Sequence, residues 1–488
     1  MKLNAASLTD VVDSVAVPTY DRSTVTAGIV HFGVGGFHRA HQAMYVDRLL
    51  NDGKATEWGI CGVGVLPGDR KMKEVMASQD CLYTLALKHA DGTWETRVIG
   101  SIVEYLFAPD DPDAVVEKLA AETTRIVSLT VTEGGYNFSP TTGEFDAANP
   151  AVQQDLQPGA LPATTFGLVV EALARRRDRG IAPFTVMSCD NIPENGHMAR
   201  STFTAYARLK DPALAQWMEA EVRFPNSMVD RITPATTPDV VAQISERFGI
   251  DDEWPVAGEP FTQWVLEDSF SVGQPPLEDA GVQLVDDVTP YELMKLRLLN
   301  ASHQALCYFG YLAGYRLVHE VAQDPLWQRF LLAYMDDEAT PTLHPVPGID
   351  LTEYKHTLIE RFSNPEIRDT VARLCAESSD RIPTWLVPVI RLNIESGGSV
   401  ELSAAVVASW ARYAEGTDEQ GEPIEIVDQL KDSLVPLARE GGTAFIENRR
   451  LFGDLADNAR FVEAYSATLE SLHSRGARAT LEGLMEGR

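Results

Sequence analysis

The sequence has few cysteines and few basic residues. Its five cysteines are scattered and include no C-x-x-C pair, which excludes a disulfide framework and a zinc site of the usual spacing. Lysine and arginine together number 41 against 71 aspartates and glutamates, for a net charge of −30. A nucleic acid or an anionic membrane would need a basic face. We therefore expect neither as a partner.

Long apolar runs are also absent. No stretch reaches the roughly 20 apolar residues that a membrane-spanning helix requires. The first residues contain one early lysine, Lys2, and their apolar positions are interrupted by Asp10 and Asp13, unlike a secretory signal. We expect a soluble cytoplasmic protein, and the scattered cysteines fit a reducing compartment.

The 488 residues suggest two or three domains. In the first half, short apolar runs alternate with helical patterns, which predicts a Rossmann-type, doubly wound α/β sheet. The predicted strands cover 28–32, 59–66, 125–133 and 183–191, and a helix covers 164–180. Two strand-like runs in 82–100 flank Asp91-Gly92, which predicts an antiparallel hairpin inserted beside the sheet.

Helical patterns dominate after about residue 285. They cover 291–320, 324–336, 352–376, 401–414, 424–439 and 456–484. We therefore predict a dinucleotide-binding domain at 1–285 and a mainly α-helical substrate and catalytic domain at 286–488.

A glycine-rich turn follows the first predicted strand, in 28-GIVHFGVGGFHRAHQAMYVDRLL-50. Gly33 and Gly35 stand where a dinucleotide-binding fingerprint has its first two glycines, but the third small residue is replaced by His38. A histidine there must point outward, or the helix must lie further from the sheet. The turn is either a pyrophosphate cradle or only a tight strand-to-helix connection.

Polar residues follow the later strands, where ligands bind in open α/β sheets. Asp69 could accept hydrogen bonds from an adenosine ribose and repel a 2′-phosphate, or it could only form the turn in P-G-D; the neighbouring Arg70 could soften the discrimination. Glu133 and Asn191 follow two further strands and suggest the floor of a cleft. Asp190 or Asn191 could instead cap the next helix.

The segment 289-TPYELMKLRLLNASHQAL-306 begins as a helix with Thr289, Pro290 and Glu292 in a capping box. At about 100° per residue, its Glu292, Lys295, Asn300 and His303 share an arc of about 140° with two leucines. A partly buried stripe of this kind predicts an active-site wall. The alternative is a surface helix with a Glu292–Lys295 ion pair.

These side chains suit the oxidation of a secondary alcohol by NAD without a metal. Lys295, with its pKa lowered in a dry pocket, could act as general base. The amides of Asn191 and Asn300 could donate hydrogen bonds to a developing alkoxide, and His303 could bind or orient a hydroxyl. No H-E-x-x-H motif and no Cys/His cluster signals a metal site.

Several stretches resemble the polyol-specific long-chain dehydrogenases, most of all the members that interconvert mannitol and fructose. These stretches are 30-VHFGVGGFHRAHQA-43, 188-SCDN-191, 224-FPNSMVDRITP-234, 290-PYELMKLRLLNASH-303 and 356-HTLIERFSNPEIRD-369. The resemblance spans nearly the whole chain. It implies a Rossmann-type N-terminal domain, a largely helical C-terminal domain and catalysis in the cleft between them. In this family F-H-R-A-H regularly follows the two glycines, so His38 is compatible with a cofactor cradle.

The resemblance also implies roles for single residues. Lys295 is implied as base, Asn191 with Asn300 as the oxyanion pair, and His303 as a substrate contact. Asp230 and Arg373 are implied at the polyol hydroxyls. Arg381 is a departure, because many relatives have lysine there, and an arginine reaches a terminal hydroxyl differently. The residues expected to hold NAD are Phe32, Gly33, Val34, Gly35, Gly36, Phe37, His38, Arg39, Asp69 and Glu133.

The expected reaction is the NAD-dependent, metal-independent interconversion of D-mannitol and D-fructose, with a small-molecule polyol or ketose as the partner. Glu292 could relay the base's proton to water or only cap the helix. A related uronate reductase, such as fructuronate reductase, stays open because Arg373 and Arg381 could bind a carboxylate. An arabinitol or sorbitol dehydrogenase is a further alternative. A non-catalytic NAD-binding sensor would not need Lys295, Asn300 and His303.

Overall fold

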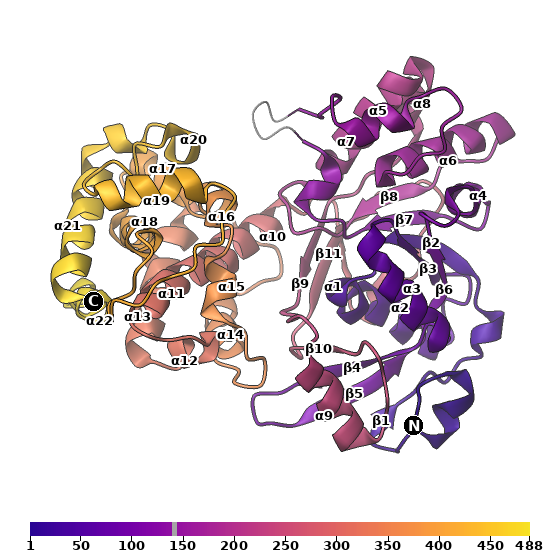
Figure 1. The fold of residues 1–488 in the computed structure, drawn as a ribbon, viewed down its shortest axis with the longest axis horizontal. Coiled ribbons are helices and arrows are strands. Elements are labelled where there is room, and N and C mark those ends of the chain that lie inside the picture. Colours follow the sequence, from indigo (N-terminus) through magenta and orange to yellow (C-terminus); the bar gives the residue numbers. More distant parts are fainter. Residues whose placement is uncertain (139–143) are drawn as a thin grey trace. The chain divides into compact units, whose positions relative to one another are not determined.

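A computed structural model describes residues 1–138 and 144–488. The chain divides into two compact units, Met1–Val288 and Thr289–Arg488. Figure 1 shows sheets and helices in the first unit and helices in the second. Among the described residues, none of the helices combines the length and the apolar character needed to cross a membrane.

The central sheet of the first unit has five strands in the order β6-β3-β2-β7-β8, and all neighbours are parallel. The strands are β2 (Ala27–Phe32), β3 (Gly59–Gly64), β6 (Ile102–Phe107), β7 (Ile126–Leu129) and β8 (Thr185–Ser188). Every residue of β2, β3, β7 and β8 is buried, as in a parallel sheet covered on both faces. The predicted Rossmann-type sheet is thereby confirmed.

The predicted hairpin is confirmed as well. Strands β4 (Tyr83–Lys88) and β5 (Trp94–Ile99) pair antiparallel. Between them, the carboxylate of Asp91 accepts a hydrogen bond from the Thr93 amide at 2.9 Å, and Gly92 has a φ of +84°. The hairpin belongs to a second sheet, completed by β1 (Val15–Ala16) and β10 (Val256–Gly258). A third sheet contains β9 (Ser227–Asp230), β11 (Gln263–Glu267) and β12 (Gln283–Val285).

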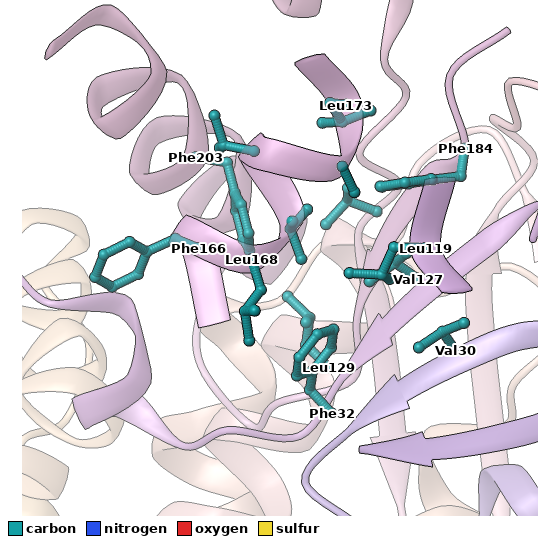
Figure 2. Close-up of a cluster of buried hydrophobic side chains, with 14 of the residues drawn as sticks. Val30, Phe32, Leu119, Val127, Leu129, Phe166, Leu168, Leu173, Phe184 and Phe203 are labelled. Carbon is teal, nitrogen blue, oxygen red and sulfur yellow. The ribbon is translucent and has the colours of Figure 1, made fainter. Parts of the chain in front are cut away.

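Helices cover the central sheet. Helix α6 (Thr165–Arg179) begins after the N-cap Thr164, whose hydroxyl accepts from the Gly167 amide, and it ends at Gly180, which has a φ of +69°. Figure 2 shows side chains of β2 and β7 in one apolar cluster with side chains of α6 and α7. The other helices of this unit are α1 (Gly36–Ala40), α2 (Gln42–Asn51), α3 (Arg70–Ser78), α4 (Pro112–Ala120), α5 (Pro150–Asp155), α7 (Asn195–Lys210), α8 (Pro212–Glu221) and α9 (Pro238–Phe248).

The second unit is helical, as predicted. Its α-helices are α10 (Thr289–Met294), α11 (Ala301–Leu312), α12 (Val318–Ala322), α13 (Pro325–Tyr334), α14 (Leu351–Phe362), α15 (Val371–Cys375), α16 (Ser378–Trp385), α17 (Val387–Ser396), α18 (Glu401–Ala414), α19 (Lys431–Glu440), α20 (Arg449–Phe452), α21 (Ala459–Arg475) and α22 (Ala477–Leu484).

Several helix predictions differ from the structure. The helix predicted to reach residue 320 ends at Leu312, shortly before Gly314, which has a φ of +98°. The helix predicted over 352–376 is broken after Phe362, because Pro365 disfavours a helical conformation at the residue before it. Helices α16 and α17 were not predicted; Pro383 lies inside the first of them and Pro388 starts the second.

Candidate active site

The turn after β2 has the shape of a dinucleotide cradle. Gly33 has a φ of +91°, and a Cβ there would lie 2.0 Å from the carbonyl oxygen of Thr130, so only glycine fits. A Cβ at Gly35 or Gly36 would meet nothing closer than 3.7 Å. The backbone at the start of α1 is therefore open on that side, as a bound pyrophosphate requires.

His38 does not point outward, so the first of the two alternatives for this position was wrong. It is buried, and its ring stacks on that of His31 in β2, with centroids 3.4 Å apart. The His31 ring also lies within hydrogen-bond distance of the hydroxyls of Ser128 (2.7 Å) and Thr130 (3.0 Å). Burial lowers the pKa of His31 to about 3 and holds that of His38 well below its ordinary value. Two neutral histidines thus join helix to strand where a small residue usually does.

The other residues expected at the cradle are mostly interior. Phe32 and Val34 are buried, and Phe37 is half-buried. Arg39 is buried too: its guanidinium donates to the Trp254 carbonyl and lies 5.3 Å from the ring centroid of Tyr83. The side chain of Arg39 therefore supports the turn from the protein interior. The side chain of Glu133 lies outside the described part of the structure.

Asp69 ends a short 3-10 turn (Pro67–Asp69) after β3. Its Oδ2 accepts hydrogen bonds from the amides of Val65 and Leu66, both at 2.9 Å. Within the described residues, Asp69 accepts hydrogen bonds through Oδ2 and not through Oδ1. The carboxylate therefore shapes the turn, as one alternative predicted, and keeps Oδ1 for a further donor.

Arg70, beside Asp69, is held by Asp110 after β6. Its guanidinium donates to both carboxylate oxygens of Asp110, at 2.8 and 3.4 Å, and Lys73 pairs with the same carboxylate at 2.5 Å. The hydrogen bonds from Arg70 and Lys73 lower the pKa of Asp110. Asp110 offsets part of the positive charge that could otherwise soften discrimination against a 2′-phosphate. Nothing in the sequence around Asp110 marks it as a candidate, because its partners Arg70 and Lys73 are 40 and 37 residues away.

Asp190 connects the ends of two neighbouring strands and caps no helix. Its carboxylate accepts from the amide of Thr132 at 2.7 Å and from the hydroxyl of Tyr136 at 2.7 Å. Helix α7 starts later, after the N-cap Glu194. The capping alternative is therefore wrong for Asp190. Asn191, the next residue, lies exposed beyond the carboxyl end of β8.

The predicted lysine helix is interrupted by a π-helical segment, Lys295–Asn300. In it the Ala301 amide donates to the Leu296 carbonyl, an i→i+5 bond. The projection at 100° per residue was wrong here, because it assumes the 3.6 residues per turn of an α-helix. A π segment has more residues per turn, so Lys295 and Asn300, which are five residues apart, lie closer to the same side than the projection predicted.

The polar side chains of this segment are buried. Lys295 is 7% exposed, Asn300 4% and His303 9%, while Glu292 in α10 is half-buried. A surface helix with an exposed ion pair is therefore excluded. The Asn300 Nδ2 has no hydrogen-bond partner among the described residues. A buried N–H group of this kind suits a ligand oxygen.

The residues expected at the polyol hydroxyls occupy different elements. Asp230 is the buried last residue of β9. Arg373 in α15 pairs with Asp369 through Nε at 2.6 Å, and this carboxylate raises the pKa of Arg373. Arg381 donates from one guanidinium nitrogen to the carbonyls of Leu374 (2.9 Å) and Arg373 (3.2 Å), at the end of α15. The ring of His303 packs 4.4 Å from that of Phe362.

No group of three or more His, Cys, Asp or Glu side chains within residues 1–138 and 144–488 is arranged to hold a metal ion.

The parallel sheet, the glycine turn after β2 and the buried Lys295 and Asn300 define a dehydrogenase of the Rossmann class. Family models for the mannitol dehydrogenase Rossmann domain and the mannitol dehydrogenase C-terminal domain match residues 27–279 and 287–473. The chain belongs to the mannitol dehydrogenase family.

Similar proteins cover the whole chain. It is 46% identical to the mannitol 2-dehydrogenase of Phaeosphaeria nodorum, over 99% of this chain and 85% of that protein. It is 45% identical to the mannitol 2-dehydrogenase of Aspergillus fumigatus, over 99% and 98%. The Pseudomonas fluorescens mannitol 2-dehydrogenase, solved as a ternary complex with NAD and D-mannitol, matches with a TM-score of 0.92 at 46% identity, covering 100% of both chains. A substrate-free D-sorbitol dehydrogenase matches with a TM-score of 0.91 at 39% identity, covering 99% and 100%.

Proposed function

We propose that the protein interconverts D-mannitol and D-fructose with NAD. The full-length similarity to mannitol 2-dehydrogenases and to a structure that contains NAD and D-mannitol supports this substrate pair. We assign cofactor binding to residues 1–285 and most of the catalytic groups to residues 286–488. The five free, buried cysteines support a reducing, cytoplasmic location.

NAD fits the first unit. Gly35 and Gly36 leave the backbone after β2 open, which supports binding of the pyrophosphate there. We propose that Oδ1 of Asp69, the carboxylate oxygen that the turn does not use, accepts from the adenosine ribose. We propose that backbone groups from Phe32 to Arg39 form the cradle, with Glu133 as a further contact. When bound, NAD supplies the acceptor of the hydride.

Lys295 is proposed as the general base. In its neutral form, its Nζ takes the proton of the reacting hydroxyl, and burial favours the neutral form of a lysine. As the proton leaves, negative charge grows on the substrate oxygen. Asn300 and Asn191 donate amide N–H groups to that oxygen. The single observation that carries this assignment is the buried Asn300 Nδ2, which has no partner among the described residues and lies in the same π segment as Lys295.

The remaining polar groups handle the proton and the other hydroxyls. Glu292, one turn before Lys295, is proposed to pass the proton from Lys295 to water. His303 contacts the reacting end of the substrate. Asp230, Arg373 and Arg381 bind hydroxyls further along the polyol chain. The assigned roles use no metal ion.

The deciding experiment follows NADH absorbance with D-fructose, fructuronate, xylulose or no substrate. We expect rapid turnover of D-fructose, with mannitol as the product. The similarity to D-sorbitol dehydrogenase makes sorbitol the second candidate, so the hexitol formed from D-fructose must be identified by chromatography. Preferred turnover of fructuronate would assign a uronate reductase, and turnover of none of them a sensor.

A further inference from the structure

The π-helical segment Lys295–Asn300 sets how the proposed base and the proposed oxyanion donor face each other. In an uninterrupted α-helix, residues five apart are about 140° apart around the axis. With i→i+5 bonds the helix has more residues per turn, which brings residues five apart closer to the same side. The π form therefore turns Lys295 and Asn300 toward the same side. Because π segments are rare and occur mostly as single turns within α-helices, we expect tertiary contacts to hold this one in place.

One contact reaches the middle of the segment. Tyr334, the last residue of α13, donates a hydrogen bond from its hydroxyl to the carbonyl oxygen of Arg297 at 3.1 Å. The side chain of Tyr334 is fully buried. Burial raises the pKa of this hydroxyl above its ordinary value, so it stays protonated and remains a donor. Arg297 in turn donates to the carbonyl oxygen of Thr342 at 2.5 Å.

The segment that follows Tyr334 is held in place by hydrogen bonds to another helix. A second π segment, Met335–Ala339, follows it directly and packs against the first. Within this second segment, the fully buried carboxylate of Glu338 accepts from the amides of Leu402 (2.7 Å) and Ser403 (2.8 Å) at the start of α18. The hydroxyl of Tyr334 is thus fixed relative to the helical core of the second unit, as a positioning group requires.

We propose that Tyr334 is a positioning residue, which holds the segment Lys295–Asn300 in its π form so that Lys295 and Asn300 act on the same substrate oxygen. The inference rests on the proposed function for the roles of these two side chains. Tyr334 takes no part in the chemistry itself. Its effect passes through the backbone of Arg297.

The test is Tyr334→Phe, which removes only the hydroxyl. We expect kcat for D-mannitol oxidation to fall about 10- to 100-fold, because misplacement of a catalytic group by about 1 Å costs that much. The KM for NAD should stay within about two-fold, since the proposed cradle is in the first unit. The primary isotope effect with D-mannitol deuterated at both C2 and C5, which are equivalent by symmetry, should rise, because hydride transfer becomes slower than the other steps.

The matched control is Tyr315→Phe. Tyr315 donates to the carboxylate of Asp324 at 2.8 Å, at the other end of the same helix α13. Its loss should leave kcat and the isotope effect unchanged. The proposal is overturned if folded Tyr334→Phe keeps the kcat of the wild type. It is equally overturned if both variants lose kcat alike with no rise in the isotope effect.

If Tyr334→Phe does not fold, Tyr334→Met makes the same test, because it also removes the donor to the Arg297 carbonyl and a flexible methionine fills the space of the ring. An unchanged kcat in that variant would contradict the proposal. If the wild-type enzyme does not oxidise D-mannitol but oxidises another polyol, the proposed substrate is refuted. The comparison of Tyr334→Phe with Tyr315→Phe is then made with that polyol, so the two failures remain distinct.

Discussion

Replacement of Asn300 by alanine separates catalysis from stability. Loss of one donor to a developing oxyanion typically lowers kcat by about 10²–10³-fold, or about 2.7–4 kcal/mol of transition-state stabilisation. The same change should cost little stability. A buried N–H group without a partner costs about 1–3 kcal/mol, and its removal offsets the loss of packing. We expect the free energy of unfolding to change by about 1 kcal/mol or less.

The assay combines kcat for D-mannitol oxidation with urea unfolding. Asn51→Ala serves as the control, because the Asn51 Nδ2 donates to the carbonyl (2.7 Å) and carboxylate (3.0 Å) of Asp47. That variant should lose stability and keep kcat. An Asn300→Ala enzyme with a turnover within a few-fold of the wild type would refute the oxyanion role. A loss of more than about 3 kcal/mol of stability would refute the argument from the unpartnered amide.

Three further predictions follow from the structure. Asp69→Ala should raise the use of NADP relative to NAD, and Asp110→Asn should raise it further by releasing Arg70; equal use of both cofactors by the wild type would contradict this reasoning. EDTA should leave activity intact, and a complete loss restored by Zn²⁺ would overturn the lysine mechanism. The pKa of His31 is lowered from 6.5 to about 3, so below pH 6.5 the unfolded chain binds a proton that the folded chain does not. The free energy of unfolding should therefore decrease as the pH is lowered from 6.5 to about 3. His31→Gln should reduce the slope of this free energy against pH by about 1.4 kcal/mol per pH unit, and an unchanged slope would contradict the burial argument.

The fold could be predicted because its strongest signals are local in sequence. Strands buried on both faces have continuous apolar runs, and Asp91-Gly92 defines a tight hairpin. Helices α16 and α17 escaped prediction because Pro383 and Pro388 read as helix breakers. Pro383 lies within the helix nonetheless, since tertiary packing can compensate for a missing backbone bond.

The details of the candidate site depend on contacts between distant residues. The π form of Lys295–Asn300 could not be predicted, because a projection assumes 3.6 residues per turn and the contact from Tyr334 to Arg297 spans 37 residues. The ion pair between Arg70 and Asp110 spans 40 residues. His31 did leave a signal, as a polar residue within an apolar strand, but its stacking on His38 follows only from the fold.

The central claim is that Lys295 is the base of alcohol oxidation, and Lys295→Ala tests it most directly. NADH affinity, measured by fluorescence titration, should stay near that of the wild type, because the proposed base lies on the substrate side. Turnover of D-mannitol should fall by orders of magnitude. The wild-type rate should rise with pH through one ionisation below the free lysine value of about 10.4, and the variant should lose this rise. A Lys295→Ala enzyme that binds NADH and oxidises D-mannitol at a near-normal rate would contradict the account.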